Sequence, residues 1–144
     1  MNDSTQGKRG EALYLAVYEH VADKADYLQP SEYRQFLPEA AIAAAVGAAF
    51  SGIIEGLWRG FIERLGEKGA DYALSLRSRL AKGKASSEEI SVIAIEIEPM
   101  LADQTVNWDE LTACVALELT RSGFSFRVSQ QLAIEISADI KANR

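Results

Sequence analysis

Small residues recur at every fourth position through the middle of this chain. The row consists of Ala40, Ala44, Ala48, Gly52, Gly56 and Gly60. On an α-helix a step of four residues advances by only about 40°, so the row forms one continuous ridge. Small side chains let a second helix approach until the two backbones nearly touch. The row therefore predicts a close helix–helix contact, and we call it the small-residue seam.

Two kinds of helix fit the seam. One is another helix of the same chain, in which case the helix that carries the seam is the buried centre of a bundle. The other is a helix of a partner or of a second copy. Each glycine in a helix interior costs about 1 kcal/mol relative to alanine, so the three glycines indicate that packing offsets this cost in either case.

Length and composition are those of one soluble globular domain. The chain has 144 residues, of which 48% are hydrophobic and 25% charged, and such a length suffices for one core. We expect a disordered, polar tail over residues 1–10 and a single domain over 11–144. The single cysteine excludes an internal disulfide, and the first ten residues lack the apolar stretch of a secretory signal. A cytoplasmic location is therefore expected.

Apolar residues at spacings of three and four predict that the chain consists of helices. The fold class is therefore all-α, a single-domain bundle of five or six helices around one long helix rich in small residues. The long helix is expected over 39–81, with a weak point at Gly66 and Gly69. Other helices are expected over 11–28, from Ser86 to Pro99, over 107–121 and over 127–142.

Capping residues mark two of these helices. Ser86 with Glu89, and Asn107 with Glu110, form capping boxes, in which the first side chain accepts a hydrogen bond from the backbone N–H three residues later. Residues 90–98 also alternate in the manner of a strand, but the cap favours a helix. Gly123 is expected to end the helix over 107–121.

No arrangement of residues typical of an enzyme is found. His20 is the only histidine and Cys114 the only cysteine, and each is interpreted as part of a helix rather than as a catalytic group. Signatures of zinc, di-iron, redox and phosphate-binding sites are missing from the sequence. We predict no enzymatic activity, no cofactor, no metal and no catalytic residue.

Charge is divided along the chain. Residues 72–87 carry only basic charges, at Arg77, Arg79, Lys82 and Lys84, whereas 88–118 carry only acidic ones. The two segments are adjacent, so we expect them to meet within one subunit, the alternative being contacts between subunits. The net charge of −6, and the few basic residues of 127–142, argue against a nucleic acid partner.

A membrane partner is the alternative hypothesis. Residues 40–54 are uncharged, but a spanning helix needs about 20 residues, which would bury Glu55 or Arg59. Conditional insertion would use Trp58, Phe61, Arg77 and Arg79 as candidate interface anchors. Glycine-zipper helices of this kind occur in small membrane-active bacterial toxins and pore-forming effectors, and the likeness covers about residues 40–62.

The sequence thus predicts a non-enzymatic helical interaction or self-assembly module that uses the seam from Ala40 to Gly60 as its contact. Its partner would be itself or another helical protein. In the alternative, the chain is a conditionally membrane-inserting, pore-forming or toxin-like effector that contacts membrane lipid.

Overall fold

Helices make up the described part of the chain, which confirms the predicted all-α class. The computed structural model describes residues 2–28, 38–58, 62–63, 66, 69–102 and 105–143. Within these residues there are no strands, and a short 3-10 helix, η1 (Ala25–Tyr27), follows the first α-helix. The α-helices are α1 (Asn2–Asp23), α2 (Pro38–Gly56), α4 (Gly69–Ala81), α5 (Ser87–Leu101), α6 (Trp108–Ser122) and α7 (Phe126–Ala142).

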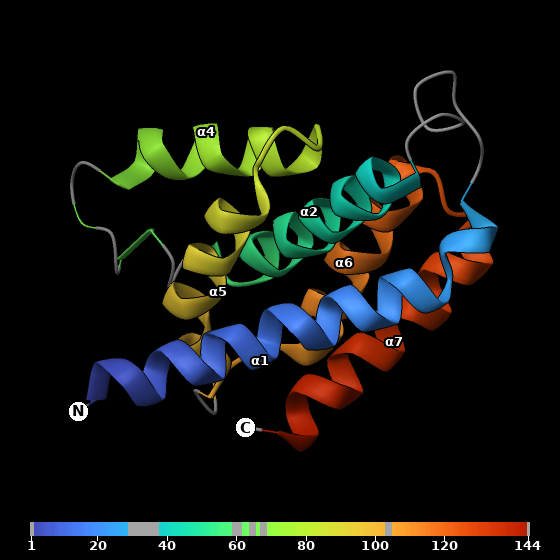
Figure 1. Cartoon of the computed structure of the whole chain (residues 1–144). Coiled ribbons are helices and arrows are strands. Elements are labelled where there is room, and N and C mark those ends of the chain that lie inside the picture. The colour runs from blue at the N-terminus through green and yellow to red at the C-terminus, as the bar shows by residue number, and fades with distance from the viewer. Residues whose placement is uncertain are drawn as a thin grey trace.

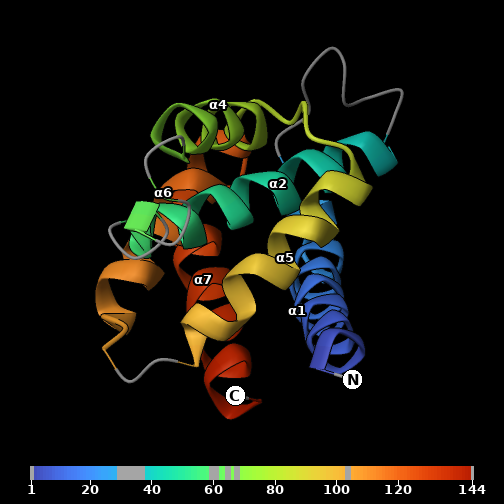
Figure 2. The same cartoon turned by 90° about the vertical axis from the view of Figure 1, so that its left-hand side faces the viewer.

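The seam helix α2 lies at the centre of the bundle. It contacts α1, α4, α5 and α6, and its most extensive contact is with α6. In both views of the cartoon α4 lies above α2 and α1 lies below it (Figures 1 and 2). α7 packs on α6 and α1, so it forms part of the outer layer. A helix that is apolar around most of its circumference is stable only in such a central position.

The long helix is shorter than the sequence predicts. α2 ends at Gly56 and α4 begins at Gly69, so the expected helix over 39–81 is interrupted well before the weak point. α4 then returns antiparallel to α2, because Gly47 lies against Leu80 and the Ser51 hydroxyl faces the Arg77 carbonyl at 3.5 Å. This antiparallel packing determines which residues of α4 face the core. On α4 the buried apolar side chains are those of Ala73, Leu76 and Leu80, whereas Tyr72 is 55% exposed.

The first helix differs from the expectation at both ends. α1 begins at Asn2, within the stretch 1–10 for which the composition predicts a disordered tail, and it ends at Asp23 rather than near residue 28. Gly10 explains part of the difference. It is buried, and a Cβ there would lie 2.6 Å from the Ile95 Cα on α5. The start of α1 is thus held by a close helix crossing that the polar composition of 1–10 concealed.

Both predicted capping boxes are confirmed at their first residue. The Ser86 Oγ accepts a hydrogen bond from the Glu89 N–H at 3.1 Å, and the Asn107 Oδ1 accepts one from the Glu110 N–H at 3.1 Å. Residues 90–98 are helical, as the cap predicted. A kink or an end is expected at Pro99, but α5 continues past it to Leu101.

α6 and α7, which correspond to the helices expected over 107–121 and 127–142, pack together as an αα-hairpin. Gly123 ends α6 with φ of 124°, a conformation that favours glycine, and the Ser125 Oγ caps α7 by accepting from the Val128 N–H at 3.3 Å. In the middle of the hairpin the Thr112 and Ser137 hydroxyls are 2.7 Å apart. Thr112 also donates to the Trp108 carbonyl at 2.7 Å. Since a hydroxyl has one proton, Ser137 is the donor to Thr112.

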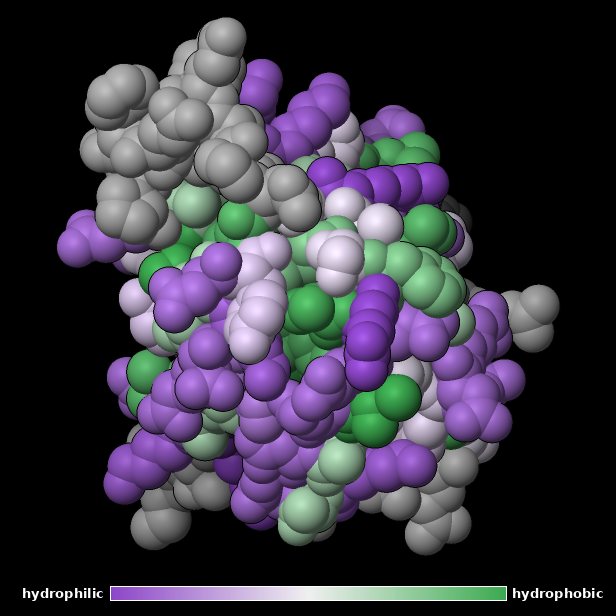
Figure 3. Space-filling view, turned by 90° about the vertical axis from the view of Figure 1, so that its right-hand side faces the viewer, coloured by the Kyte–Doolittle hydropathy of each residue, from purple (hydrophilic) through white to green (hydrophobic). Residues whose placement is uncertain are grey.

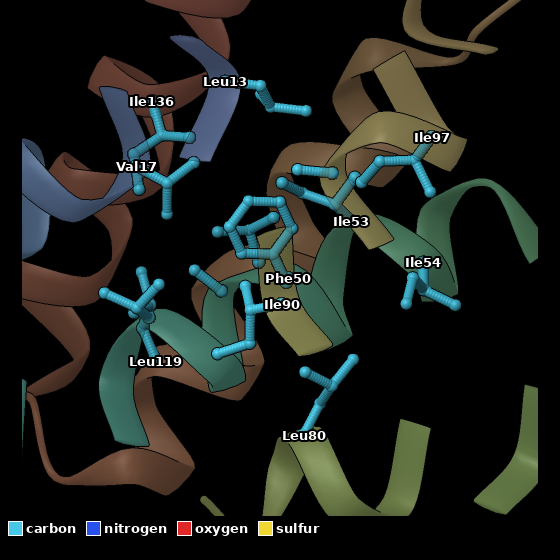
Figure 4. Packing of buried hydrophobic residues seen from close by; sticks show 14 of the residues in the cluster. Leu13, Val17, Phe50, Ile53, Ile54, Leu80, Ile90, Ile97, Leu119 and Ile136 are labelled. Carbon is cyan, nitrogen blue, oxygen red and sulfur yellow. The ribbon is translucent and has the colours of Figure 1, made fainter. Parts of the chain in front are cut away.

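The core is formed by apolar side chains from every one of these α-helices. From outside, the face on the right-hand side of Figure 1 is largely hydrophilic, with apolar residues reaching the surface in its middle (Figure 3). Inside, Phe50 of α2 lies among side chains of the surrounding helices (Figure 4). Phe50 is fully buried, and its ring stacks on that of Tyr14 with centroids 6.4 Å apart.

Ser129 of α7 provides a test of the core. Its hydroxyl is fully buried and has no hydrogen-bond partner among the described residues. We expect Ser129→Ala to raise the free energy of unfolding by about 1 kcal/mol, because it removes an unsatisfied polar group. Urea denaturation followed by circular dichroism measures the change.

Ser137→Ala is the matched control on the same helix. Ser137 is also buried, but its hydroxyl donates to Thr112, so its loss should lower the free energy of unfolding by about 1 kcal/mol. Equal destabilisation by both substitutions would contradict the assignment of Ser129 as the unsatisfied group.

Candidate interaction site: the small-residue seam

The members of the seam differ in exposure along α2. Ala40 is exposed, Ala44 is half-buried, and Ala48 and Gly52 are buried. Gly56, the last residue of α2, is half-buried. Gly60 lies outside the described residues. The seam is therefore exposed at the start of α2, buried at Ala48 and Gly52, and half-buried again at the last residue of the helix.

The occupant of the buried part of the seam is α6 of the same chain. A Cβ at Gly52 would lie 2.5 Å from the Val115 Cα and 2.8 Å from the Val115 N. A Cβ at Gly56 would lie 2.7 Å from the Leu111 Cα. Real Cβ atoms do not come this close to backbone, so both positions require glycine. The contacts also show that α2 and α6 run antiparallel.

α4 and the turn that follows it cover a further part of α2, which includes the seam residue Ala44. A Cβ at Gly47 would lie 3.0 Å from the Leu80 carbonyl oxygen. Gly83, with φ of 71°, brings its turn so close to α2 that an added Cβ would lie 2.7 Å from the Ala44 Cβ. The sequence allowed two kinds of helix to pack on the seam. At Gly52 and Gly56 the helix that packs there belongs to the same chain. Ala40 is the exposed member of the part of the seam that the structure describes.

The candidate interface anchors are engaged within the chain. The Arg77 guanidinium lies 4.3 Å from the centroid of the partly buried Trp58 ring and pairs with Glu55. Arg79 pairs with Glu89 across the turn between α4 and α5. Phe61 lies outside the described residues. The ion pair of Arg79 with Glu89 joins the basic segment 72–87 to the acidic segment 88–118 within one subunit, as expected. Arg77 instead pairs with Glu55, which lies on α2.

His20 connects two helices. Its Nε2 lies 2.9 Å from the Asp139 Oδ2, which joins α1 to α7. The other Asp139 oxygen accepts a hydrogen bond from the Asn143 Nδ2 at 2.6 Å. This pairing was not apparent in the sequence, because 119 residues separate the two partners. Both side chains are about one-third exposed, so the pair is a surface contact between helices.

Cys114 lies half-buried on α6, at the edge of a groove with a volume of about 420 Å³ between α4 and α6. Burial raises the pKa of the Cys114 thiol, and the carboxylates of Glu55, Glu110 and Glu118 raise it further. Because the thiolate is the reactive form, this environment disfavours a nucleophilic role. Within the described residues no three His, Cys, Asp or Glu side chains are placed to hold a metal ion.

The raised pKa of Cys114 predicts slow alkylation. At pH 8 a smaller fraction of this thiol is ionised than of a free cysteine, so iodoacetamide should react several-fold more slowly with the native protein than with the urea-unfolded protein. Mass spectrometry of samples quenched over time measures both rates. Equal native and unfolded rates would contradict the raised pKa of the Cys114 thiol.

One described helix is long and apolar enough to cross a membrane by length and composition. Its span is Glu39–Gly56, with a mean hydropathy of 1.3, and 61% of the span is buried inside the bundle. The central helix of a water-soluble bundle has the same properties. This finding is therefore compatible with both a soluble and a membrane-associated protein.

Comparisons of the chain with protein-family models, with curated proteins and with solved structures find no match. Any function proposed for the chain therefore rests on the geometry of the seam and of the surrounding surface.

Proposed function

We propose that the protein is a non-enzymatic helical module that assembles with itself or with another helical protein. The observation that carries the proposal is that large apolar side chains remain exposed on the helices around α2, whereas the seam itself is used within the chain. The seam glycines Gly52 and Gly56 hold α6 close against α2. In this proposal the seam shapes the module, and partners bind to its outer faces.

Exposed apolar side chains support a role in binding. Large apolar residues that are about half exposed or more occur on all the helices that surround α2. Phe126, the first residue of α7, is 66% exposed. Ile134, about two turns further along the same helix, is 60% exposed. Aromatic and aliphatic side chains of this size are the usual anchors of a protein–protein contact. The expected location is the cytoplasm, and no nucleic acid partner is expected for a chain with a net charge of −6.

Conditional membrane insertion is the second candidate, and the span Glu39–Gly56 favours it. In this alternative the outer helices separate from α2, which then enters the bilayer with help from Trp58 and the basic residues of α4. Such a step must break the contact of Gly52 and Gly56 with α6. The first proposal requires no such opening, so we place it ahead of the second.

Size-exclusion chromatography with light scattering, with and without anionic liposomes, distinguishes the two. For an interaction module we expect a mass that rises with protein concentration and does not respond to lipid. Assembly or vesicle binding that occurs only with lipid would support the second candidate. A monomer at every concentration that also ignores lipid would contradict self-assembly and leave a different helical protein as the partner.

A further inference from the structure

A groove with a volume of about 500 Å³ lies among α1, α5 and α7. Its apolar lining includes Leu13, Leu101 and Ile140, which are nearly fully buried and form the floor. Its polar lining comprises Arg9, Glu19, Glu98, Asp139 and Asn143. The volume is in the range of sites that hold a small molecule or a few side chains of a partner. We call it the acidic groove.

The acidic groove carries uncompensated negative charge. Asp139 is paired with His20 and accepts from Asn143. Glu19 and Glu98 have no ion pair or hydrogen bond within the part of the chain that the structure describes. Arg9 contributes one positive charge to the same lining. The lining thus holds three carboxylates and one guanidinium, a formal charge of −2, and an occupant with two positive charges and some apolar surface matches it.

The chain itself carries a segment with these properties. Lys82 and Lys84 lie exposed in the turn between α4 and α5, and they have no acidic partner among the described residues, whereas Arg77 and Arg79 are paired. Gly83 holds the turn against α2 with φ of 71°, so the two lysines project from a fixed support. Lysine side chains lay their aliphatic stems on apolar surface and keep the ammonium groups at its edge. We call this turn the basic tip.

The basic tip and the acidic groove lie at opposite ends of the molecule. In both views the turn after α4 is at the top, whereas the C-terminal end of α7, which lines the groove, is at the bottom (Figures 1 and 2). The tip of one molecule therefore cannot reach its own groove, and it is free to enter the groove of another. A contact between two different surfaces is heterologous, and it extends into a chain unless a rotation closes it into a ring.

We infer that a second copy of this chain occupies the acidic groove, with its Lys82 and Lys84 placed at Glu19 and Glu98. This inference rests on the proposed self-assembly and specifies its geometry as head-to-tail. The lysine stems cover the apolar floor, and the ammonium groups meet the two unpaired carboxylates. Because the charges lie at the edge of the contact, salt weakens the assembly.

Charge reversal at each surface tests the inference. Sedimentation velocity at an ionic strength of about 0.01 M, where the Debye length is about 30 Å, reports the mean mass against concentration. We expect Lys84→Glu and Glu98→Lys each to raise the dissociation constant about tenfold or more. Arg127→Glu and Glu11→Lys are the matched controls, because they make the same charge changes at exposed positions outside both surfaces, and they should leave the dissociation constant within about twofold of the wild type.

Mixing the variants tests the head-to-tail geometry. In an equimolar mixture the intact tip of the Glu98→Lys variant meets the intact groove of the Lys84→Glu variant, and the reversed tip meets the reversed groove with opposite charges. The mixture should therefore form the longer assemblies that neither variant forms alone. The double variant with both substitutions should recover longer assemblies. If the wild type assembles and neither single reversal weakens it, this inference is overturned and self-assembly stands. If the wild type stays monomeric at every concentration, self-assembly itself fails.

Discussion

Replacement of Gly52 by leucine is expected to destabilise the fold by about 3 kcal/mol or more, at the upper end of the range for overpacked cores. Even a Cβ at this position would lie 2.5 Å from the Val115 Cα. That atom belongs to the backbone of α6, so no change of rotamer relieves the clash, and the two helices must separate. Separation in turn uncovers apolar residues on both helices.

Gly52→Ala and Ala43→Leu make the test specific. Alanine is the better helix former by about 1 kcal/mol, so a net loss of stability from Gly52→Ala isolates the cost of the clash. Ala43 is exposed on the same helix, and leucine there should change the free energy of unfolding by less than about 0.5 kcal/mol. Urea denaturation followed by circular dichroism measures all three variants. A Gly52→Leu protein as stable as the wild type would refute the joint between α2 and α6.

Helix ends that depend on capping residues and on a C-terminal glycine were predicted correctly from the sequence. The side chains of Ser86 and Asn107 satisfy backbone N–H groups within three residues, and Gly123 supplies a conformation needed within its own turn. Such interactions depend on nearby residues alone, so they are readable from the chain. The capped start of α5 also resolved the ambiguity of residues 90–98 in favour of a helix.

The end of α2 was not predictable in the same way. Glycine at 56 continues the seam, and it is also a residue at which a helix ends readily. The sequence pattern favoured continuation to residue 81, but the chain leaves the helix after Gly56 and returns as α4. The reversal depends on the packing of α4 against α2, where Leu80 meets Gly47, and this contact joins residues far apart in the sequence.

The helix that packs on the seam could not be predicted from the sequence either. A row of small residues specifies how closely a helix approaches and says nothing of which helix approaches. Gly52 therefore predicted a close contact but not its partner, Val115 on α6. The same limit applies to Gly10, whose close contact with Ile95 was concealed by the polar residues around it. The acidic groove combines residues of α1, α5 and α7, and no single stretch of sequence contains its pattern.

The second large effect is expected at the centre of the core. Phe50→Ala should lower the free energy of unfolding by about 3–5 kcal/mol, because it removes a fully buried ring and leaves a cavity. It also removes the stacking contact with Tyr14 of α1. Urea denaturation measures the loss. Phe126→Ala is the matched control: its ring is 66% exposed, so a change of less than about 0.5 kcal/mol is expected.

The same pair of variants separates the two candidate functions. Phe50 lies on α2, and a weaker core opens more often, which exposes the span Glu39–Gly56 to solvent. If α2 is built to enter a bilayer, the Phe50→Ala protein should co-float with anionic vesicles more than the wild type or the Phe126→Ala protein does. If α2 is only the central helix of an interaction module, opening exposes a span that contains the charged residues Glu39 and Glu55, whose burial in a bilayer is unfavourable. Phe50→Ala and Phe126→Ala should then co-float to the same extent, and that is the result we expect.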